Sequence, residues 1–327
     1  MSPDLRVVFV YDPNSFNSYG AELASVLVSG GYRVVRLSHR SASVGTVGGV
    51  DLTVFGSFHI IKLFAVAARM IMARKPALVV AWAPSRTHVS IVRVLSRLSH
   101  RVFVVNHNPR SGRSNSSNAA SFKALLASRF VTEVRHVSGA RRNSVNEVYH
   151  PSYRRFMDST AGALVDAQGI RYDALFFGTA RADKGVSFLP GIARRLKQAE
   201  KQLAIRVGRC SQDEAEFLRS IVDADVFVGE TVHVSNEQLA RVLAECAAVV
   251  APYSEVTTSG SAIMAVTYGK PVLLLRSESM EWLLPDSMYV SIDDLTQALC
   301  DGILSQPALS ASEIDELCLS SWRDVLV

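Results

Sequence analysis

The stretch "VVAPYSEVTTSGSAIMAVTYGKPVLLL" runs from Val249 to Leu275 and shows most clearly how the chain folds. Two apolar runs typical of buried strands flank a segment of Ser, Thr and Gly, which opens into a helix of small residues ending at "YGKP". A helix that begins just beyond a strand end presents free backbone N–H groups and the positive end of its dipole, so this segment predicts an anion site. Ser and Thr are also favoured N-caps, and a capped helix without a ligand is the alternative.

The rest of the chain alternates strand and helix patterns in the same way. "RVVFVYD" (6–12) is a buried-strand pattern, followed by a helix over 21–29 and a strand over 33–37. "SNEQ" predicts a capping box with Ser235 as N-cap and Gln238 as its partner. Further strands are expected at 51–55, 77–82, 101–106, 172–177, 203–207, 225–228 and 288–292, and further helices at 59–74, 87–98, 122–128, 186–198, 212–221, 236–246, 294–304 and 312–326. Such alternation predicts an α/β fold with mostly parallel, doubly wound sheets.

The length of 327 residues favours two domains over one. Clear periodicity is lost over "YHPSYRRFMDSTAGALVDAQG" (149–169) and then restarts. We therefore expect two Rossmann-like domains that face a cleft, at 1–155 and 156–327. The last helix, 312–326, is a candidate to pack back on the first domain.

Several general properties indicate the class of protein. The sequence has no apolar run of about 18 residues and no basic-then-apolar leader pattern, which predicts a cytoplasmic protein. The helix pattern over 59–74 is interrupted by Lys62 and Arg69 and is expected to pack in a core rather than anchor in a membrane. The four cysteines form no metal-binding pattern and are expected to be reduced thiols.

Charge is unevenly divided along the chain. Residues 1–150 contain 19 Lys/Arg and 6 Asp/Glu, whereas residues 151–327 contain 16 and 24. The first part thus suits an anionic partner, such as a membrane surface, a phosphorylated acceptor or nucleic acid; an uneven but solvated surface is the alternative. A basic stripe on one predicted helix face and just past its end favours anionic lipid, and consists of Arg86, Arg93, Arg97 and Arg101.

A second candidate anion site is "FFGTARADKG" (176–185), which follows a predicted strand. Arg181 and Lys184 could hold phosphate oxygens, and the glycines would let the backbone approach closely. A solvated loop lysine is the alternative for Lys184.

Together these segments resemble the GT-B glycosyltransferases, and most closely the retaining, GT4-like group. "GTARADKG" is similar to the family's G-R-x-x-x-x-K-G loop, and "PYSEVTTSGSAIMAVTYGKPV" (252–272) to its donor element in a variant with P-Y-x5-S-G and G-K-P-V. "VSNEQLARVLAECAAVVAPYSE" (234–255) resembles the stretch leading into that element. In the first half, "NSYGAELASVLVSGGYRV" (17–34) is similar to the G-G-x-E loop and "VNHNP" (105–109) to the strand-end His, while "YHPSY" (149–153) lies where the family crosses between domains.

The resemblance implies which residues act. His107, Lys184 and Arg181 would be the catalytic residues, with His107 contacting the donor sugar. Donor contacts would come from Gly178, Thr179, Gly208, Glu255, Thr258, Ser259, Gly260, Ser261, Tyr19 and Gly20.

Three positions depart from the family pattern. Tyr19 stands at the first Gly of G-G-x-E, Thr179 at the phosphate Arg, and Met264 at the second Glu of the E-x7-E pair, with Glu255 one residue out of register with the first. The phosphate cradle is therefore expected to be kept, while the sugar-binding carboxylates are altered.

The expected activity is transfer of a hexosyl group, with retention of anomeric configuration, from a nucleotide-diphosphate sugar to a lipid-linked acceptor or cell-surface glycan precursor. We expect no cofactor or metal, because the diphosphate would be stabilised by Lys184, Arg181 and backbone N–H groups. The alternatives are a catalytically weakened GT-B-fold binding protein, a sugar-nucleotide epimerase of related fold, or a nucleic-acid-binding protein, for which no recognisable module appears.

Overall fold

The computed structural model describes residues 7–13, 18–39, 48–55, 59–73, 76–83, 85–107, 117–164, 169–208, 210–229, 234–254 and 258–327. Contacts between Cα atoms divide the chain into two compact units. The first contains residues up to Val137, Arg142–Phe156 and Ser312–Val327, and the second contains Ser138–Arg141 and Met157–Ala311.

The first unit is built on a seven-stranded parallel sheet with the order β3-β2-β1-β4-β5-β6-β7. Its strands are β1 (Val7–Asp12), β2 (Arg33–His39), β3 (Val50–Phe55), β4 (Ala77–Val80), β5 (Arg101–Asn106), β6 (Val131–His136) and β7 (Glu147–Val148). Its helices are α1 (Tyr19–Ser29), α2 (His59–Met72), α3 (Arg86–Ser96), α4 (Ser117–Leu126) and α12 (Ala311–Leu326), while α5 (Arg154–Ser159) runs across the division between the units.

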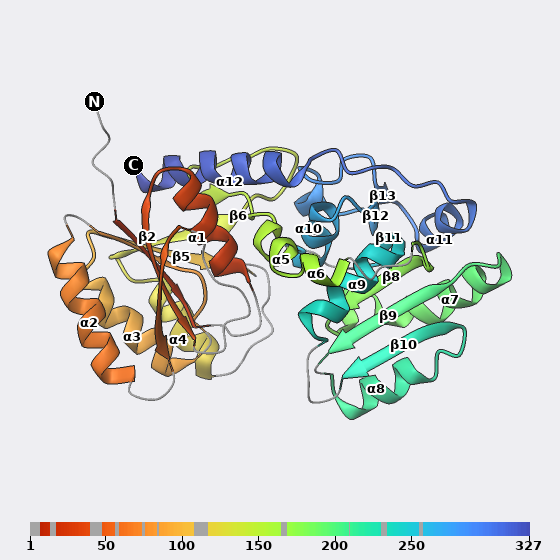
Figure 1. The fold of residues 1–327 in the computed structure, drawn as a ribbon, viewed down its shortest axis with the longest axis horizontal. Coiled ribbons are helices and arrows are strands. Elements are labelled where there is room, and N and C mark those ends of the chain that lie inside the picture. The colour runs from red at the N-terminus through yellow and green to blue at the C-terminus, as the bar shows by residue number, and fades with distance from the viewer. Residues whose placement is uncertain are drawn as a thin grey trace. The chain divides into compact units, whose positions relative to one another are not determined.

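Alternating side chains of the first sheet form two core layers. Val8 and Val10 of β1 face one layer together with α1 and α12, where Trp322 is fully buried. Phe9 and Tyr11 face the opposite layer together with α2, α3 and α4. Figure 1 shows α2, α3 and α4 side by side along their face of this sheet, and α12 beside α1. The sheet is thus covered on both faces, as its apolar strands require.

The second unit is built on a six-stranded parallel sheet with the order β10-β9-β8-β11-β12-β13. Its strands are β8 (Tyr172–Gly178), β9 (Leu203–Gly208), β10 (Ala224–Gly229), β11 (Cys246–Ala251), β12 (Val272–Leu275) and β13 (Met288–Tyr289). Its helices are α6 (Ala161–Leu164), α7 (Leu189–Gln198), α8 (Gln212–Arg219), α9 (Asn236–Glu245), α10 (Gly260–Thr267) and α11 (Ile292–Asp301), with short 3-10 turns at Ala182–Lys184, Val186–Phe188 and Glu278–Met280. The α/β, Rossmann-like fold class predicted from the sequence is confirmed.

Capping residues and strand starts explain where the observed element boundaries agree with the predicted ones and where they differ. The predicted capping box is confirmed, since Ser235 Oγ accepts the N–H of Gln238 at 3.2 Å and Gln238 Oε1 accepts the N–H of Ser235 at 3.1 Å. The predicted strand over 288–292 was too long, because Ser291 caps α11 by accepting the N–H of Asp294 at 3.1 Å. The predicted helix over 236–246 was one residue too long, since Cys246 begins β11.

Two other expectations need correction. The loop expected over 107–121 was too long, because α4 begins at Ser117; residues 108–116 lie outside the described chain. The helix predicted over 59–74 corresponds to α2, and it packs in the core on one side only. Val66 and Met70 of α2 are buried, whereas Phe64, Ile71 and Met72 are exposed. No helix within the described residues is both long enough and apolar enough to span a bilayer.

Candidate functional site

Each sheet has one place where the strand order reverses. In the second unit, β8 is followed outward by β9 and β10, and the chain then returns to place β11 on the other side of β8. In the first unit the same reversal lies between β1 and β4. In open α/β sheets the carboxyl ends of the strands at such a reversal form a crevice where ligands bind. The two predicted anion-site segments follow β8 and β11, and Tyr19 follows β1, whereas His107 follows β5 and Gly208 ends β9.

The two predicted anion-site segments meet at the reversal in the second unit. A Cβ added to Gly178, the last residue of β8, would lie 3.2 Å from Ser261 Oγ in the first turn of α10. Gly178 also has φ of 129°, a conformation that side-chain-bearing residues rarely adopt. The backbone at the end of β8 and the start of α10 therefore approach each other closely because position 178 is glycine.

The loop after β8 packs against the loop after β11. A Cβ added to Gly185 (φ 68°) would lie 1.8 Å from the carbonyl oxygen of Pro252, so no other residue fits there without a backbone shift. The N–H of Ser254 donates to the carbonyl of Asp183 at 3.2 Å. Lys184 Nζ lies 3.9 Å from the centroid of the Tyr253 ring, which holds the ammonium group by a cation–π contact. The loop carrying Lys184 is thus fixed to the loop before α10.

The start of α10 has the properties of an anion-binding helix end. Ser259 is fully buried and its Oγ accepts the N–H of Ala262 at 3.2 Å. The N–H groups of Gly260 and Ser261 belong to the first turn, where helix geometry provides no intrahelical acceptor, and both residues are partly exposed. Thr258 is partly exposed beside them. These groups can donate hydrogen bonds to phosphate oxygens.

The other residues predicted to contact the donor differ in exposure and in the partners that they already have. Thr179 is exposed just after β8, and Gly208 is buried at the end of β9, the neighbour of β8. Arg181 is exposed and pairs with Asp183 at 2.9 Å, so binding a phosphate would require it to leave or share that carboxylate. Glu255 lies outside the described residues. Met264, which replaces a family carboxylate, is 9 % exposed and belongs to the apolar core.

Three histidines form a chain at the carboxyl ends of β5, β6 and β7, next to the reversal in the first unit. His107 Nε2 lies 2.8 Å from the carbonyl oxygen of Ala81, and this acceptor requires the proton to be on Nε2. His107 Nδ1 therefore accepts, and His136 donates to it from Nε2 at 3.1 Å. His136 Nδ1 is left as an acceptor, with no hydrogen-bond partner among the described residues. His150 donates from Nδ1 to the carbonyl of Pro151 at 2.6 Å.

Burial keeps these rings neutral. Burial lowers the pKa of His107 to about 4 against the opposing bond to Ala81, and lowers the pKa of His150 to about 3. Burial also lowers the pKa of His136, and its neighbours His107 and His150 lower it further. At neutral pH, His107 can move a proton to or from a ligand only by breaking one of its bonds within the protein. Residue His107 as a whole is partly exposed.

Tyr19 and Gly20 position the start of α1 against this cluster. The Tyr19 ring is 3 % exposed and meets His107, His136 and His150 edge-on at centroid distances of 4.6, 5.5 and 4.8 Å. A Cβ added to Gly20 would lie 2.3 Å from Asp12 Oδ2, so glycine allows the helix to approach the end of β1. Tyr19 is therefore a packing residue here. Sequence reasoning missed His136 and His150, whose only signal was a histidine at or just after a strand end.

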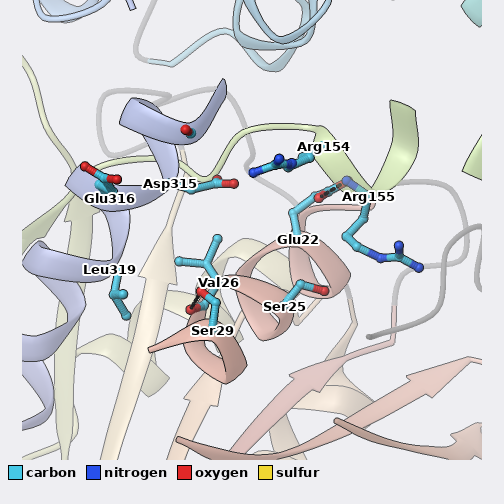
Figure 2. Close-up of a pocket in the computed structure, with 10 residues that line it drawn as sticks. Glu22, Ser25, Val26, Ser29, Arg154, Arg155, Asp315, Glu316 and Leu319 are labelled. Atoms are coloured by element: carbon cyan, nitrogen blue, oxygen red, sulfur yellow. Dashed lines mark hydrogen bonds between the residues drawn. The ribbon is translucent and has the colours of Figure 1, made fainter. Parts of the chain in front are cut away.

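A separate pocket of about 310 Å³ lies among α1, the start of α5 and α12 (Figure 2). Glu22 is 2 % exposed, and its two carboxylate oxygens accept the N–H groups of Arg155 at 2.8 Å and Phe156 at 2.7 Å. Burial raises the pKa of Glu22 to about 8, although the two N–H bonds oppose the rise. Asp315 of α12 accepts the N–H of Ser152 at 2.9 Å. Both carboxylates thus bind backbone N–H groups at and just before α5, which gives them a structural role.

The basic stripe is confirmed as an exposed feature. Arg86 and Arg93 lie on α3, Arg97 caps its end and Arg101 begins β5, and all four are exposed. Among the described residues, no three His, Cys, Asp or Glu side chains are grouped as metal ligands. The four cysteines form no disulfide.

Comparison with known proteins places this geometry in context. No family model matches the chain. Two curated relatives from Xanthomonas campestris pv. campestris, both described as GDP-mannose:glycolipid 4-beta-D-mannosyltransferase, are 27 % and 26 % identical over 137 residues. The match covers 40 % of this chain and 39 % of each relative, so the chain spans about two fifths of the length of the curated relatives it matches.

Solved structures match over nearly the whole chain. Sucrose-phosphate synthase from Thermosynechococcus elongatus has a TM-score of 0.53 with 13 % identity, covering 97 % of this chain and 94 % of that one. The catalytic domain of starch synthase IV from Arabidopsis thaliana, bound to ADP and acarbose, has a TM-score of 0.52 with 9 % identity, covering 99 % and 100 %. An alpha-glucosyltransferase in complex with UDP and DNA has a TM-score of 0.54 with 9 % identity, covering 97 % and 95 %. The resemblance noted in the sequence is thus confirmed for the fold: the chain has the two-domain, Rossmann-like architecture of the GT-B glycosyltransferases.

Proposed function

We propose that this protein is a glycosyltransferase that moves a hexosyl group from a nucleotide-diphosphate sugar to a glycan or glycolipid acceptor. The observation that carries the proposal is the meeting of the two predicted anion-site segments at the β8/β11 reversal, where Gly178 lies against Ser261 and the Lys184 loop lies against Pro252. The fold is shared with glycosyltransferases, and the curated relatives are described as mannosyltransferases that use GDP-mannose and a glycolipid.

The reaction would break the bond between the anomeric carbon and a phosphate oxygen of the donor. That carbon forms a new bond to an acceptor hydroxyl oxygen, whose proton leaves, and the nucleoside diphosphate departs with the additional negative charge. Lys184 and the first-turn N–H groups at Gly260 and Ser261 would stabilise this charge, because preformed donors cost little reorganisation when charge develops. Arg181 would assist after releasing Asp183. Retention of anomeric configuration, and action without a metal, remain predictions.

The choice of donor follows from the relatives rather than from this chain's own residues. Because their names specify GDP-mannose and a glycolipid, GDP-sugars and lipid-linked acceptors are the first substrates to test. A lipid-linked acceptor would bring the protein to a membrane surface, and the exposed stripe of Arg86, Arg93, Arg97 and Arg101 would contact anionic headgroups there. This peripheral contact on the cytoplasmic face is part of the proposal.

One observation favours a second candidate. Met264 is buried in the core where the resembled family has a sugar-binding carboxylate. A binding protein of the same fold, with transfer weakened or lost, would keep the phosphate cradle and lose that contact. Such a protein would bind nucleoside diphosphates without turning over their sugars.

The test combines binding and turnover. Purified protein is screened for thermal stabilisation by UDP, GDP and ADP, and then incubated with the corresponding sugars while sugar release or transfer is measured. A ligand that binds the folded state raises the melting temperature by mass action. The proposed enzyme shows both stabilisation and turnover, and Lys184→Ala abolishes the turnover. Stabilisation without turnover identifies the binding protein, and interconversion of epimers would identify an epimerase.

A further inference from the structure

The helices α2, α3 and α4 form one layer on the first sheet, and its charge is of one sign. Between Asp51 and Glu133 the sequence contains no Asp or Glu at all. The same segment contains twelve cationic side chains: Lys62, Arg69, Arg74, Lys75, Arg86, Arg93, Arg97, Arg101, Arg110, Arg113, Lys123 and Arg129. Soluble surfaces usually intersperse both signs of charge. The three helices themselves carry five of these cations and no carboxylate, which gives the layer a positive field. The five are Lys62, Arg69, Arg86, Arg93 and Lys123.

Large apolar side chains are exposed on the same layer. On α2, Phe64 is 74 % exposed, Ile71 69 % and Met72 75 %, while Val66 and Met70 on the other side are buried against the sheet. Positions 64, 71 and 72 are seven and eight residues apart, which places them on one outer face of the helix. We call Phe64, Ile71 and Met72 the apolar face of α2.

The neighbouring helices extend this combination of apolar and cationic groups. Val94 on α3 is 58 % exposed, and Phe130 just after α4 is 64 % exposed with the Arg129 guanidinium 4.8 Å from its ring centroid. Arg69 on α2, Arg93 on α3 and Lys123 on α4 are exposed. Figure 1 shows the three helices side by side on the same face of the sheet. Cations thus accompany exposed apolar groups on α2 and α3 and at the segment between α4 and β6.

We infer that this layer docks on an anionic phospholipid surface, with the apolar face of α2 inserted at the boundary between headgroups and acyl chains. The inference deepens the membrane contact in the proposed function: it adds an insertion helix to a stripe that would act by charge alone. Interfacial helices combine a basic surface with large apolar side chains in this way, since the cations draw anionic headgroups and the apolar groups leave water. A nucleic-acid backbone would satisfy the cations, but the aliphatic Ile71 and Met72 would gain nothing from it.

The experiment measures how the protein partitions onto phosphatidylcholine vesicles, either pure or containing about one third phosphatidylglycerol. The insertion variant is Phe64→Ser/Ile71→Ser/Met72→Ser, and the charge variant is Arg93→Glu/Arg97→Glu. The matched control is Val222→Ser/Val290→Ser, which removes two side chains of the second unit that are 83 % and 81 % exposed. Melting curves confirm that each variant is folded. A Phe64→Trp variant adds a direct measure of depth, by quenching with brominated lipid.

The parent protein should bind anionic vesicles at least about tenfold more tightly than neutral ones. The insertion variant should lose at least about tenfold of the anionic binding and the control should lose none, and brominated lipid should quench the Phe64→Trp fluorescence. Parent-like binding of the insertion variant, or no quenching, overturns the inference, even if the charge variant releases the protein. Binding to RNA or duplex DNA but not to vesicles at about 0.15 M salt also overturns it. GDP or UDP stabilisation, measured on the same samples, reports on the donor site independently.

Discussion

The regions at the two sheet reversals differ in the groups that form them, which are backbone groups in the second unit and side-chain rings in the first. The β8/β11 reversal is made of backbone: Gly178 and Gly185 allow close approach, and the start of α10 presents N–H groups. Beside the β1/β4 reversal the contacts are between side-chain rings: Tyr19, at the start of α1, packs among His107, His136 and His150 from the ends of β5, β6 and β7. The first arrangement suits an anion, because it concentrates donors. The second is neutral and mostly buried, and it shapes a surface without offering charge.

Because the buried neutral histidines lie in the first unit, we predict that acid destabilises the first unit much more than the second. The folded-state pKa values of His107 and His150 are lowered to about 4 and about 3, whereas an unfolded histidine titrates near 6.5. Between these values the unfolded chain binds more protons, so stability is complete above about pH 6.5 and falls as pH decreases towards 4. Each histidine can contribute up to about 1.4 kcal/mol per pH unit.

Hydrogen exchange followed by mass spectrometry at pH 4.5 and 6.5 separates the units, once intrinsic exchange rates are corrected for pH. Peptides covering β5 and β6 should lose protection at the lower pH, while those covering β8 and β11 keep theirs. Equal loss in both sheets would show that the histidine cluster is not the source of acid sensitivity.

Glu22 should act in the opposite direction on the same unit. Its pKa is raised to about 8 by burial, so between about pH 4.5 and 8 the folded state holds a proton that the unfolded state has lost. Stability is then present at low pH and decreases as pH rises through this window, by at most about 1.4 kcal/mol per pH unit. With the histidines, this places the stability maximum of the first unit near pH 6.5. Urea unfolding of Glu22→Gln should show a flatter profile from pH 6.5 to 8; an unchanged slope would assign the decline to another group.

Gly185→Ala tests the backbone-built reversal. The new methyl group would lie 1.8 Å from the Pro252 carbonyl oxygen at a φ of 68°, so the loop must move or strain. We expect a loss of about 3 kcal/mol or more in the free energy of unfolding, measured with urea.

The matched control is Gly191→Ala in α7, where nothing lies within 4 Å of the added methyl group. A glycine in a helix interior is less favourable than alanine by about 0.5–1 kcal/mol, so this variant should be neutral or more stable. If both variants behaved alike, the close approach at Pro252 would not be what fixes the Lys184 loop.

His136→Ala tests the histidine cluster of the first unit. The change removes a buried ring and leaves His107 Nδ1 without its donor, which should cost about 2 kcal/mol of stability. Nucleotide affinity should stay within about twofold of the parent, because the proposed phosphate contacts all lie in the second unit. Calorimetry and urea unfolding on the same variant give both numbers. A large loss of affinity with unchanged stability would instead make His136 part of the donor site.

The same contrast explains what could be predicted from sequence. The β8/β11 site uses contiguous backbone, so its segments, "GTARADKG" and "TTSGS", were visible as motifs. The histidine cluster is assembled from three segments, the end of β6 and the residues after β5 and β7. Each segment contributes one histidine, and no local sequence pattern marks it. His107 was identified only through a family motif, and its partners could not be.

Element types were predictable where one period dominated, as in β1 and α3. Predictions were wrong where a cap outweighed an apolar run, as at Ser291, or where a strand followed a helix without a turn, as at Cys246. The exposure of Phe64, Ile71 and Met72 was missed because α2 is apolar nearly all round, and such composition does not say which side meets the sheet.

The central claim is that the β8/β11 reversal binds a nucleoside diphosphate through its phosphates. The most direct test is calorimetric titration of the parent, Lys184→Ala and the surface control Lys197→Ala with GDP, UDP and ADP. We predict that at least one nucleotide binds the parent and Lys197→Ala equally, and that Lys184→Ala weakens it about tenfold or more, as expected for a lost charge-assisted contact. Absence of binding by all three nucleotides, or equal affinity in Lys184→Ala, would contradict the claim.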